Sequence, residues 1–303
     1  MSIVVSNLTK EYGIQKAVND ISFTVNKGEI VGFIGPNGAG KSTTMKIITG
    51  YIRNYTGTVE VNGLELSKNL IDVKRQIGYL PEHNPLYLDM YVREYLRFVA
   101  GIHKLGKESA ARINNVIELT GLGNEQKKKI GSLSKGYRQR VGLASTLVHD
   151  PAVLILDEAT TGLDPNQIVE IRNLIANVGK EKTVLLSTHI MQEVEAICHK
   201  VIIINKGKIV MDDISENVNS YSKETRQNVY AEFSKEVDAK QIANIAGVVE
   251  VQNIDNNKWL IVGNGLIDIR PNIFDFAVKN AVQVLSLHEQ QQSLEDVFRE
   301  VTK

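Results

Sequence analysis

The 303-residue sequence has one cysteine, one tryptophan and no surplus of charge, with 35 Lys and Arg against 35 Asp and Glu. A single cysteine excludes an intrachain disulfide framework and a cysteine-ligated metal cluster, and it is typical of a reducing compartment. Zero net charge disfavours nucleic acid as the main partner, because binding a phosphate backbone at scale needs a basic excess. Any anion site in this chain must therefore be local.

Long apolar runs are also missing. A helix that spans a bilayer needs roughly 18 apolar residues or more, whereas runs such as 152–156 and 201–204 are much shorter. The first ten residues lack a basic region followed by an apolar stretch, so we expect no secretory signal. If this protein works at a membrane, we expect something else to hold it there.

Short apolar segments alternate with helical patterns over the first 215 residues, which predicts an α/β region. Strands of a parallel sheet covered on both faces read as continuous apolar runs. A helix is expected before the last of these strands, because Asp164 can cap it and Pro165 suits its first turn. The segments that read as buried parallel strands are 30–34, 152–156 and 183–187.

Two further features surround this predicted core. Antiparallel strands are expected at 3–8, 21–25 and 58–61, the last of which ends at Asn62-Gly63, a strong hairpin-turn dipeptide. Apolar residues at helical spacing fill the segment from about 86 to 147, which interrupts the α/β pattern. We interpret that segment as a helical subdomain inserted between two core strands.

The pattern changes near Ser215. Residues 216–225 are polar and are predicted to link a first domain, 1–215, to a second, 226–303. The second domain has the order β-α-β-β-α-β, which is typical of a ferredoxin-like α+β fold, and a closing helix from about Ser293. It is either a structural appendage or a regulatory or dimerising unit. Its predicted strands are 228–233, 248–254, 258–262 and 284–287, and its predicted helices are 237–246 and 271–282.

The segment from Gly35 to Ser42 matches the phosphate-loop pattern G-x-x-x-x-G-K-[ST]. An apolar strand precedes it, and the helix-compatible segment 41–48 follows it. In such a loop, backbone N–H groups face the phosphates, the lysine contacts the β- and γ-phosphates, and the hydroxyl ligates Mg²⁺. The alternative is an ordinary glycine-rich turn. The predicted nucleotide-binding residues here are Gly35, Asn37, Gly38, Gly40, Lys41, Ser42 and Thr43.

Two acids and a histidine follow the later buried strands. Ligands of parallel sheets bind at the carboxyl ends of strands, which places Asp157 and Glu158 beside the phosphate loop. We predict that Asp157 holds Mg²⁺ and that Glu158 orients the attacking water, unless the pair only caps the next segment. His189 ends the next strand and is expected either to contact the γ-phosphate or to be a satisfied strand-end histidine.

Together these motifs resemble the ATP-binding subunit of an ABC transporter. Residues 133–137, Leu-Ser-Lys-Gly-Tyr, are similar to the family's signature motif, usually L-S-G-G-Q, and Ser134 can cap the following helix. The resemblance implies a P-loop ABC cassette with a mixed core sheet, an antiparallel β subdomain and a helical subdomain. It also implies hydrolysis of ATP with Mg²⁺ by a head-to-tail homodimer. In that dimer, Ser134 and Gly136 contact the ATP bound by the partner subunit.

Three more positions take their roles from the resemblance. Tyr12 is similar to the aromatic residue that stacks on adenine, although a core tyrosine at a strand end is the alternative. Asp164 belongs to a segment that resembles the D-loop between the two sites. Glu82 occupies the Q-loop position, where the family usually has glutamine; it is expected to ligate Mg²⁺ while adding negative charge near the triphosphate.

The end of the chain, 292–298, is similar to exporter ATPases that work with six-helix permeases of the ABC-2 type. The whole chain, including 80–90, resembles the gliding-motility-associated ATP-binding subunit. This implies a peripheral motor at the cytoplasmic face of a bacterial inner membrane, coupled to export in gliding motility, with no nucleic acid as partner. The alternative function is a nucleotide-gated clamp on nucleic acid or ribosomes. Such relatives carry a long coiled coil or two cassettes, and this chain fits neither.

Overall fold

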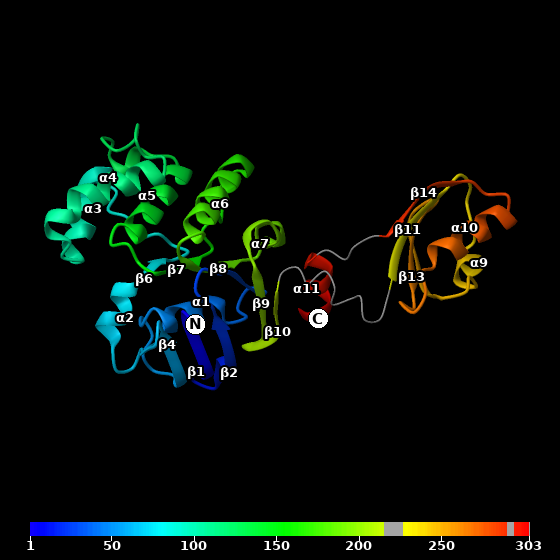
Figure 1. Ribbon diagram of the computed structural model, residues 1–303, viewed down its shortest axis with the longest axis horizontal. Helices are drawn as coiled ribbons and strands as arrows, with labels where there is room; N and C mark the ends of the chain where they lie inside the picture. The colour runs from blue at the N-terminus through cyan, green and yellow to red at the C-terminus, as the bar shows by residue number, and fades with distance from the viewer. Residues whose placement is uncertain (215–226, 290–293, 303) are drawn as a thin grey trace. The chain divides into compact units, whose positions relative to one another are not determined.

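A computed structural model describes residues 1–214, 227–289 and 294–302 (Figure 1). The chain divides into two compact units, Met1–Ser215 and Glu216–Val301. The predicted linker, 216–225, lies outside the described residues. Among the described residues, we find no helix with the length and apolar character needed to cross a bilayer.

A six-stranded sheet forms the centre of the first unit. In spatial order its strands are β10 (Lys208–Ile214), β9 (Lys200–Asn205), β3 (Ile30–Ile34), β8 (Thr183–Thr188), β7 (Val153–Asp157) and β6 (Ile77–Leu80). β9 to β6 run parallel, and β10 pairs antiparallel at the edge. All residues of β3, β7 and β8 are buried, which confirms the three strands predicted to lack a polar face.

The second sheet of this unit is antiparallel. Its strands, in spatial order, are β2 (Gln15–Val25), β1 (Ile3–Tyr12), β4 (Thr56–Val61) and β5 (Leu64–Glu65). β1 and β2 are longer than predicted, because their polar ends continue the backbone ladder where no apolar pattern marks it. Asn62 and Gly63 form the predicted two-residue turn, with φ of 47° and 78°.

One apolar core joins the two sheets through helix α1 (Lys41–Ile48). Met45, Ile47 and Ile48 of α1 belong to a cluster that includes residues of both sheets. Phe23 of β2 and Phe33 of β3 meet with their ring centroids 5.4 Å apart. This packing fixes the start of α1, and hence the loop before it, at the carboxyl ends of the strands of the six-stranded sheet.

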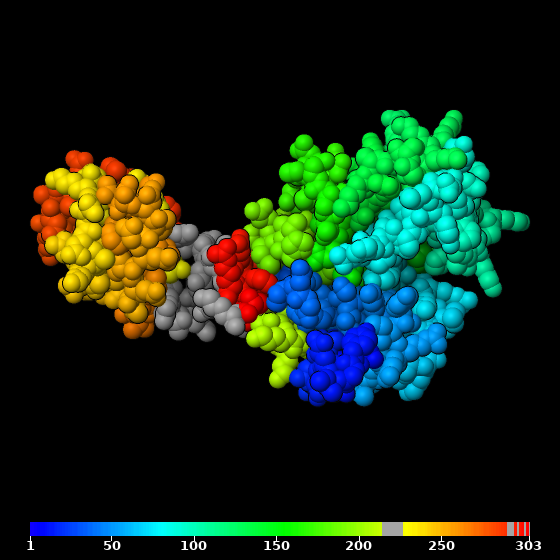
Figure 2. All heavy atoms as spheres, turned by 180° about the vertical axis from the view of Figure 1, so that it is seen from behind, coloured from blue at the N-terminus to red at the C-terminus, as the bar shows by residue number. Residues whose placement is uncertain are grey.

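Besides α1, the described helices of the first unit are α2 (Leu70–Gln76), α3 (Val92–Ile102), α4 (Ser109–Leu119), α5 (Lys135–Leu147), α6 (Pro165–Gly179) and α7 (Met191–Ile197). The predicted helical subdomain consists of α3, α4 and α5, which lie on the side of the six-stranded sheet away from the antiparallel sheet (Figures 1 and 2). Asp164 caps α6, since its side chain accepts a 2.9 Å hydrogen bond from Gln167 N–H, and Pro165 begins the helix as predicted. The sequence did not predict α2.

The second unit has one four-stranded antiparallel sheet in the spatial order β12-β13-β11-β14. Its elements are β11 (Gln227–Phe233), α9 (Ala239–Ala243), β12 (Val248–Asp255), β13 (Lys258–Gly263), α10 (Arg270–Lys279), β14 (Val284–Glu289) and α11 (Leu294–Thr302). The order β-α-β-β-α-β is the one expected. The helix predicted at 237–246 is shorter. It begins at Ala239, because the Asp238 side chain caps it through the N–H of Lys240, and it ends at Ala243.

Candidate functional site

Three parallel strands end side by side at one edge of the six-stranded sheet. The last residues of β3 and β8 are register partners, and the last residue of β7 pairs with Ser187 of β8. The segments that follow these strands therefore leave the sheet together. They are the glycine-rich loop 35–40, Glu158 and His189. This is the edge at which α/β proteins bind their ligands.

A cavity of about 410 Å³ lies at this edge. It brings together side chains and backbone from separate parts of the sequence, including most of the predicted phosphate-loop, carboxylate and histidine positions. Of its lining residues, Ala17 and Thr161 were not predicted. The lining residues are Ala17, Asn37, Gly38, Gly40, Lys41, Ser42, Thr43, Glu82, Glu158, Thr161 and His189.

The backbone of the loop depends on glycine. Gly38 and Gly40 adopt φ of 78° and 115°, in the left-handed region that side chains with a Cβ disfavour. A methyl group at Gly40 would also lie 2.5 Å from the carbonyl oxygen of Ala17. Gly40 directly precedes α1, so the loop presents the N-terminus of that helix to the cavity.

The Lys41 ammonium lies buried over this loop. Nζ donates to the carbonyl oxygens of Gly35 at 2.7 Å and Pro36 at 3.3 Å, and it lies 3.9 Å from Glu158 Oε1. Burial lowers the Lys41 pKa, and the carboxylates of Glu158, Asp157 and Glu82 oppose that shift. The ammonium is therefore held where a polyanion can replace its carbonyl partners.

Hydroxyl oxygens of two serines lie next to the Asp157 carboxylate. Its Oδ1 accepts hydrogen bonds from Ser42 Oγ at 3.2 Å and from Ser187 Oγ at 2.5 Å. Carboxylate and hydroxyl oxygens are the hard ligands that Mg²⁺ prefers, so this donor set fits that ion. Ser187 was missed as a site residue, because only the pairing of β7 with β8 brings it to Asp157.

Glu158 is buried and is held by three neighbours. It adopts φ of 52°, and its N–H donates to both the carbonyl oxygen and Oγ of Ser187, each at 3.1 Å. A non-glycine residue in this region stores about 1–2 kcal/mol of strain. Its carboxylate Oε2 accepts from Thr161 Oγ1 at 2.9 Å and lies 2.7 Å from His189 Nδ1. The carboxylate therefore has a fixed orientation beside the cavity.

Six predicted site residues do not line this cavity. Two of them, Gly35 and Asp157, contact residues that do, Lys41 and Ser42. The other four lie elsewhere in the first unit. Tyr12 is 51% exposed at the end of β1, with Lys10 Nζ 4.7 Å from its ring centroid, which excludes the core-tyrosine alternative. Ser134 caps α5 as predicted, because its Oγ accepts from Tyr137 N–H. Gly136 packs against the side chain of Gln167, and Asp164 caps α6.

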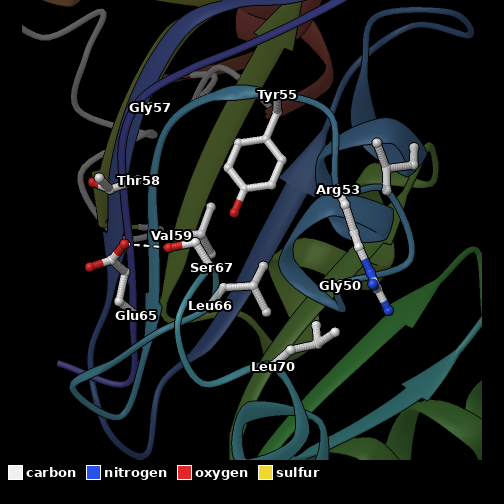
Figure 3. A pocket seen from close by; sticks show the side chains of 11 residues that line it. Gly50, Arg53, Tyr55, Gly57, Thr58, Val59, Glu65, Leu66, Ser67 and Leu70 are labelled. Atoms are coloured by element: carbon white, nitrogen blue, oxygen red, sulfur yellow. Dashed lines mark hydrogen bonds between the residues drawn. The ribbon is translucent and has the colours of Figure 1, made fainter.

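A second cavity, of about 290 Å³, lies between the end of α1 and the β4–β5 hairpin (Figure 3). The Tyr55 hydroxyl points into it, and Ser67 donates a hydrogen bond to Glu65 at its edge. Burial raises the Tyr55 pKa. Its lining, among the residues that the structure describes, includes none of the predicted site residues.

The comparisons with known proteins agree with this geometry. Residues 18–161 match the family model described as ABC transporter. The bacitracin transport ATP-binding protein BcrA of Bacillus licheniformis is 35% identical over 304 residues, which cover 98% of this chain and 95% of that protein. The lantibiotic transport ATP-binding protein SrtF of Streptococcus pyogenes is 36% identical over 71% of this chain and 93% of its own length.

Solved structures show the same cassette. One described as the ATP binding subunit of an ABC transporter aligns with a TM-score of 0.66 and 30% identity, over 73% of this chain and 93% of that chain. The structure of cbiO1 from Clostridium perfringens aligns with a TM-score of 0.66 and 29% identity, over 72% and 90%. Fold and site thus define a P-loop ATPase with the ABC cassette fold. The chain belongs to the family of ABC transporter ATP-binding proteins, which bind and hydrolyse ATP.

Proposed function

We propose that this chain is the ATP-hydrolysing motor of a membrane exporter and drives a permease of the ABC-2 type. The match to BcrA supports the transport role, because it extends over 98% of the chain and so includes the second unit. The permease type rests on the resemblance of residues 292–298. BcrA is named for bacitracin transport, and the shorter relative SrtF for lantibiotic transport. In this function the chain acts peripherally at the cytoplasmic face of a bacterial inner membrane.

In this proposal the phosphate loop and Lys41 bind the triphosphate. Backbone N–H groups of the loop and the N-terminus of α1 face the phosphates. The Lys41 ammonium then exchanges the carbonyls of Gly35 and Pro36 for β- and γ-phosphate oxygens, and it retains its charge against burial through the nearby carboxylates.

Ser42 and Asp157 are proposed to hold Mg²⁺, with Glu82, which also lines the cavity, as a further oxygen ligand. When bound, that ion neutralises charge on the phosphates. Glu158 accepts a hydrogen bond from the attacking water and orients it toward the γ-phosphate. His189 fixes the Glu158 carboxylate and donates toward the same phosphate as charge develops there.

Two copies are proposed to close on ATP head to tail. Ser134 and Gly136 stand at the first turn of α5, so the positive end of this helix can face the ATP of the partner subunit. Tyr12 is half exposed at a strand end and is free to stack on adenine. Asp164 lies in the D-loop between the two sites.

Capture of membrane partners tests the proposed transport role. The tagged full chain is incubated with detergent-solubilised membranes of its source bacterium, with an unrelated tagged protein as control. We expect a membrane protein with six predicted spans to be enriched. Enrichment of ribosomes or nucleic acid instead would support the clamp function and contradict this proposal.

We further propose, from the resemblance around residues 80–90, that the exported cargo serves gliding motility. Deleting the gene is expected to abolish gliding, and the native chain, but not the Glu158→Gln variant, to restore it. Unchanged gliding in the deletion strain would contradict this assignment while leaving the transport role intact.

A further inference from the structure

Asn84 connects the nucleotide cavity to the signature helix. It lies two residues after Glu82, and its Nδ2 donates a 3.2 Å hydrogen bond to the carbonyl oxygen of Arg138 in α5. In an α-helix the Arg138 carbonyl also accepts the N–H of residue 142, and its second lone pair is the one available to Asn84. The first turn of this same helix carries Ser134 and Gly136.

This contact exists because residue 142 is glycine. A methyl group there would overlap Asn84 Nδ2, lie 2.7 Å from Asn84 Cγ and lie 2.9 Å from Leu80 Cδ1. Glycine in the interior of a helix is unfavourable relative to alanine, so a glycine here calls for a packing reason. Here the reason is the space that the Asn84 amide needs beside the helix.

A third cavity, of about 450 Å³, shares Glu82, Glu158 and Thr161 with the nucleotide cavity. Asn84 and Arg138 stand on its walls. Asn84 therefore lies between the carboxylate that faces the nucleotide and the helix whose first turn is proposed to face the partner's ATP.

We propose that Asn84 is a positioning residue for ATP hydrolysis. Its amide packs in the space left by Gly142, called the notch below, and so connects the segment that carries Glu82 to the signature helix, α5. This inference rests on the proposed function of the two sites. Asn84 itself is not among the residues that line the nucleotide cavity. It sets how far α5 lies from the segment that carries Glu82, so that α5 and Glu82 move as one when ATP binds.

Three variants of the full chain test the notch. Asn84→Ala removes the amide, Asn84→Asp keeps its shape but has no donor for the Arg138 carbonyl, and Gly142→Ala fills the notch. Each is expected to lower kcat about five- to tenfold, the effect of about one hydrogen bond. KM for ATP is expected to change less than about twofold, because the nucleotide contacts stay intact.

Gly101→Ala is the matched control. Gly101 lies in α3, and a methyl group there would meet no heavy atom within 4 Å. This variant therefore makes the same change in helix propensity as Gly142→Ala but displaces no neighbouring side chain. We expect native kcat for it. Thermal melting of all variants accompanies the kinetics, and a Gly142→Ala chain that fails to fold leaves the Asn84 variants to decide.

The double variant Asn84→Ala/Gly142→Ala shows whether the two single variants lower kcat through the same contact or independently of each other. If both residues act through one contact, the double variant loses no more kcat than Asn84→Ala alone. The inference would be overturned if the fold losses in kcat of the two single variants multiply in the double variant, or if Asn84→Asp has native kcat. Absence of ATP turnover in the native chain would instead overturn the proposed function itself.

Discussion

His189 Nδ1 lies 2.7 Å from Glu158 Oε2, although the two residues are 31 positions apart in the sequence. The Glu158 side chain is 9% exposed and that of His189 is 53% exposed, so the pair joins a buried acid to the open side of the cavity. The parallel register of β7 and β8 creates this contact, because each residue follows directly after its strand. Thr161 donates to the same Glu158 oxygen at 2.9 Å.

Loss of the His189 imidazole is expected to slow hydrolysis more than it weakens binding. In His189→Ala, Glu158 keeps Thr161 but loses its closer partner and the donor near the γ-phosphate. We expect kcat to fall by about tenfold or more, with KM for ATP changed less than about threefold. His288→Ala, in the second unit, is the control. A native kcat for His189→Ala would remove His189 from the proposed mechanism.

Loss of the Lys41 ammonium is expected to weaken nucleotide binding. Lys41→Ala removes the one cation that lies buried over the phosphate loop in the described cavity. The Kd for ATP, measured calorimetrically, is expected to rise at least about tenfold, or ~1.4 kcal/mol. Lys46→Ala, near the other end of the same helix, serves as control. An unchanged Kd for Lys41→Ala would contradict the assigned phosphate contact.

Glu82 is expected to affect the magnesium requirement. Glu82→Gln keeps the size of the side chain but removes a charged oxygen ligand from the cavity. The Mg²⁺ concentration that gives half-maximal turnover is expected to rise about threefold or more, because carboxylate binds this ion better than amide. Glu118→Gln, exposed on α4, is the control. A magnesium dependence identical to that of the native chain would count against direct ligation by Glu82.

His149 is expected to make the first unit sensitive to acid. Its ring stacks on His103 with centroids 3.7 Å apart, and its Nε2 lies 3.1 Å from the carbonyl oxygen of Ile77. Burial, then the neighbouring His103, lowers the His149 pKa from 6.5 to about 4. Between pH 6.5 and pH 4 the unfolded chain therefore binds more protons at His149 than the folded chain does. The free energy of unfolding is consequently highest above pH 6.5 and decreases as the pH falls toward 4.

The size of this loss is up to about 3 kcal/mol in the free energy of unfolding, followed by circular dichroism in urea from pH 7 to 4.5. His149→Gln is expected to flatten that pH dependence, whereas exposed His83→Gln leaves it unchanged. A His149→Gln chain with the native acid sensitivity would show that this ring is not the sensitive group.

The sequence predicted those parts of the site that depend on short-range patterns. The strand before Gly35, the helix from Lys41 and the cap at Asp164 are each specified by adjacent residues, and all three are observed. The antiparallel hairpin at Asn62-Gly63 follows the same rule. Local chemistry was sufficient in these cases.

Contacts between distant segments could not be predicted in this way. Ser187 meets Asp157, 30 positions away in the sequence, only because of the register of β7 and β8. The notch for Asn84 at Gly142 depends on how α5 packs near β6. α2 has seven residues, of which only Val73 is buried, so it is too short for a helical period to stand out in the sequence. Such features need the order of strands and the packing of helices, which no single pattern contains.

ATP turnover of Glu158→Gln tests the central claim most directly, because this substitution leaves the size of the side chain and removes only the charge that orients water. Turnover of the native chain and the variant is measured side by side with the permease present, and ATP binding is measured separately. We expect turnover to fall at least about a hundredfold while ATP binding is retained. Undiminished hydrolysis by Glu158→Gln would contradict the proposed mechanism.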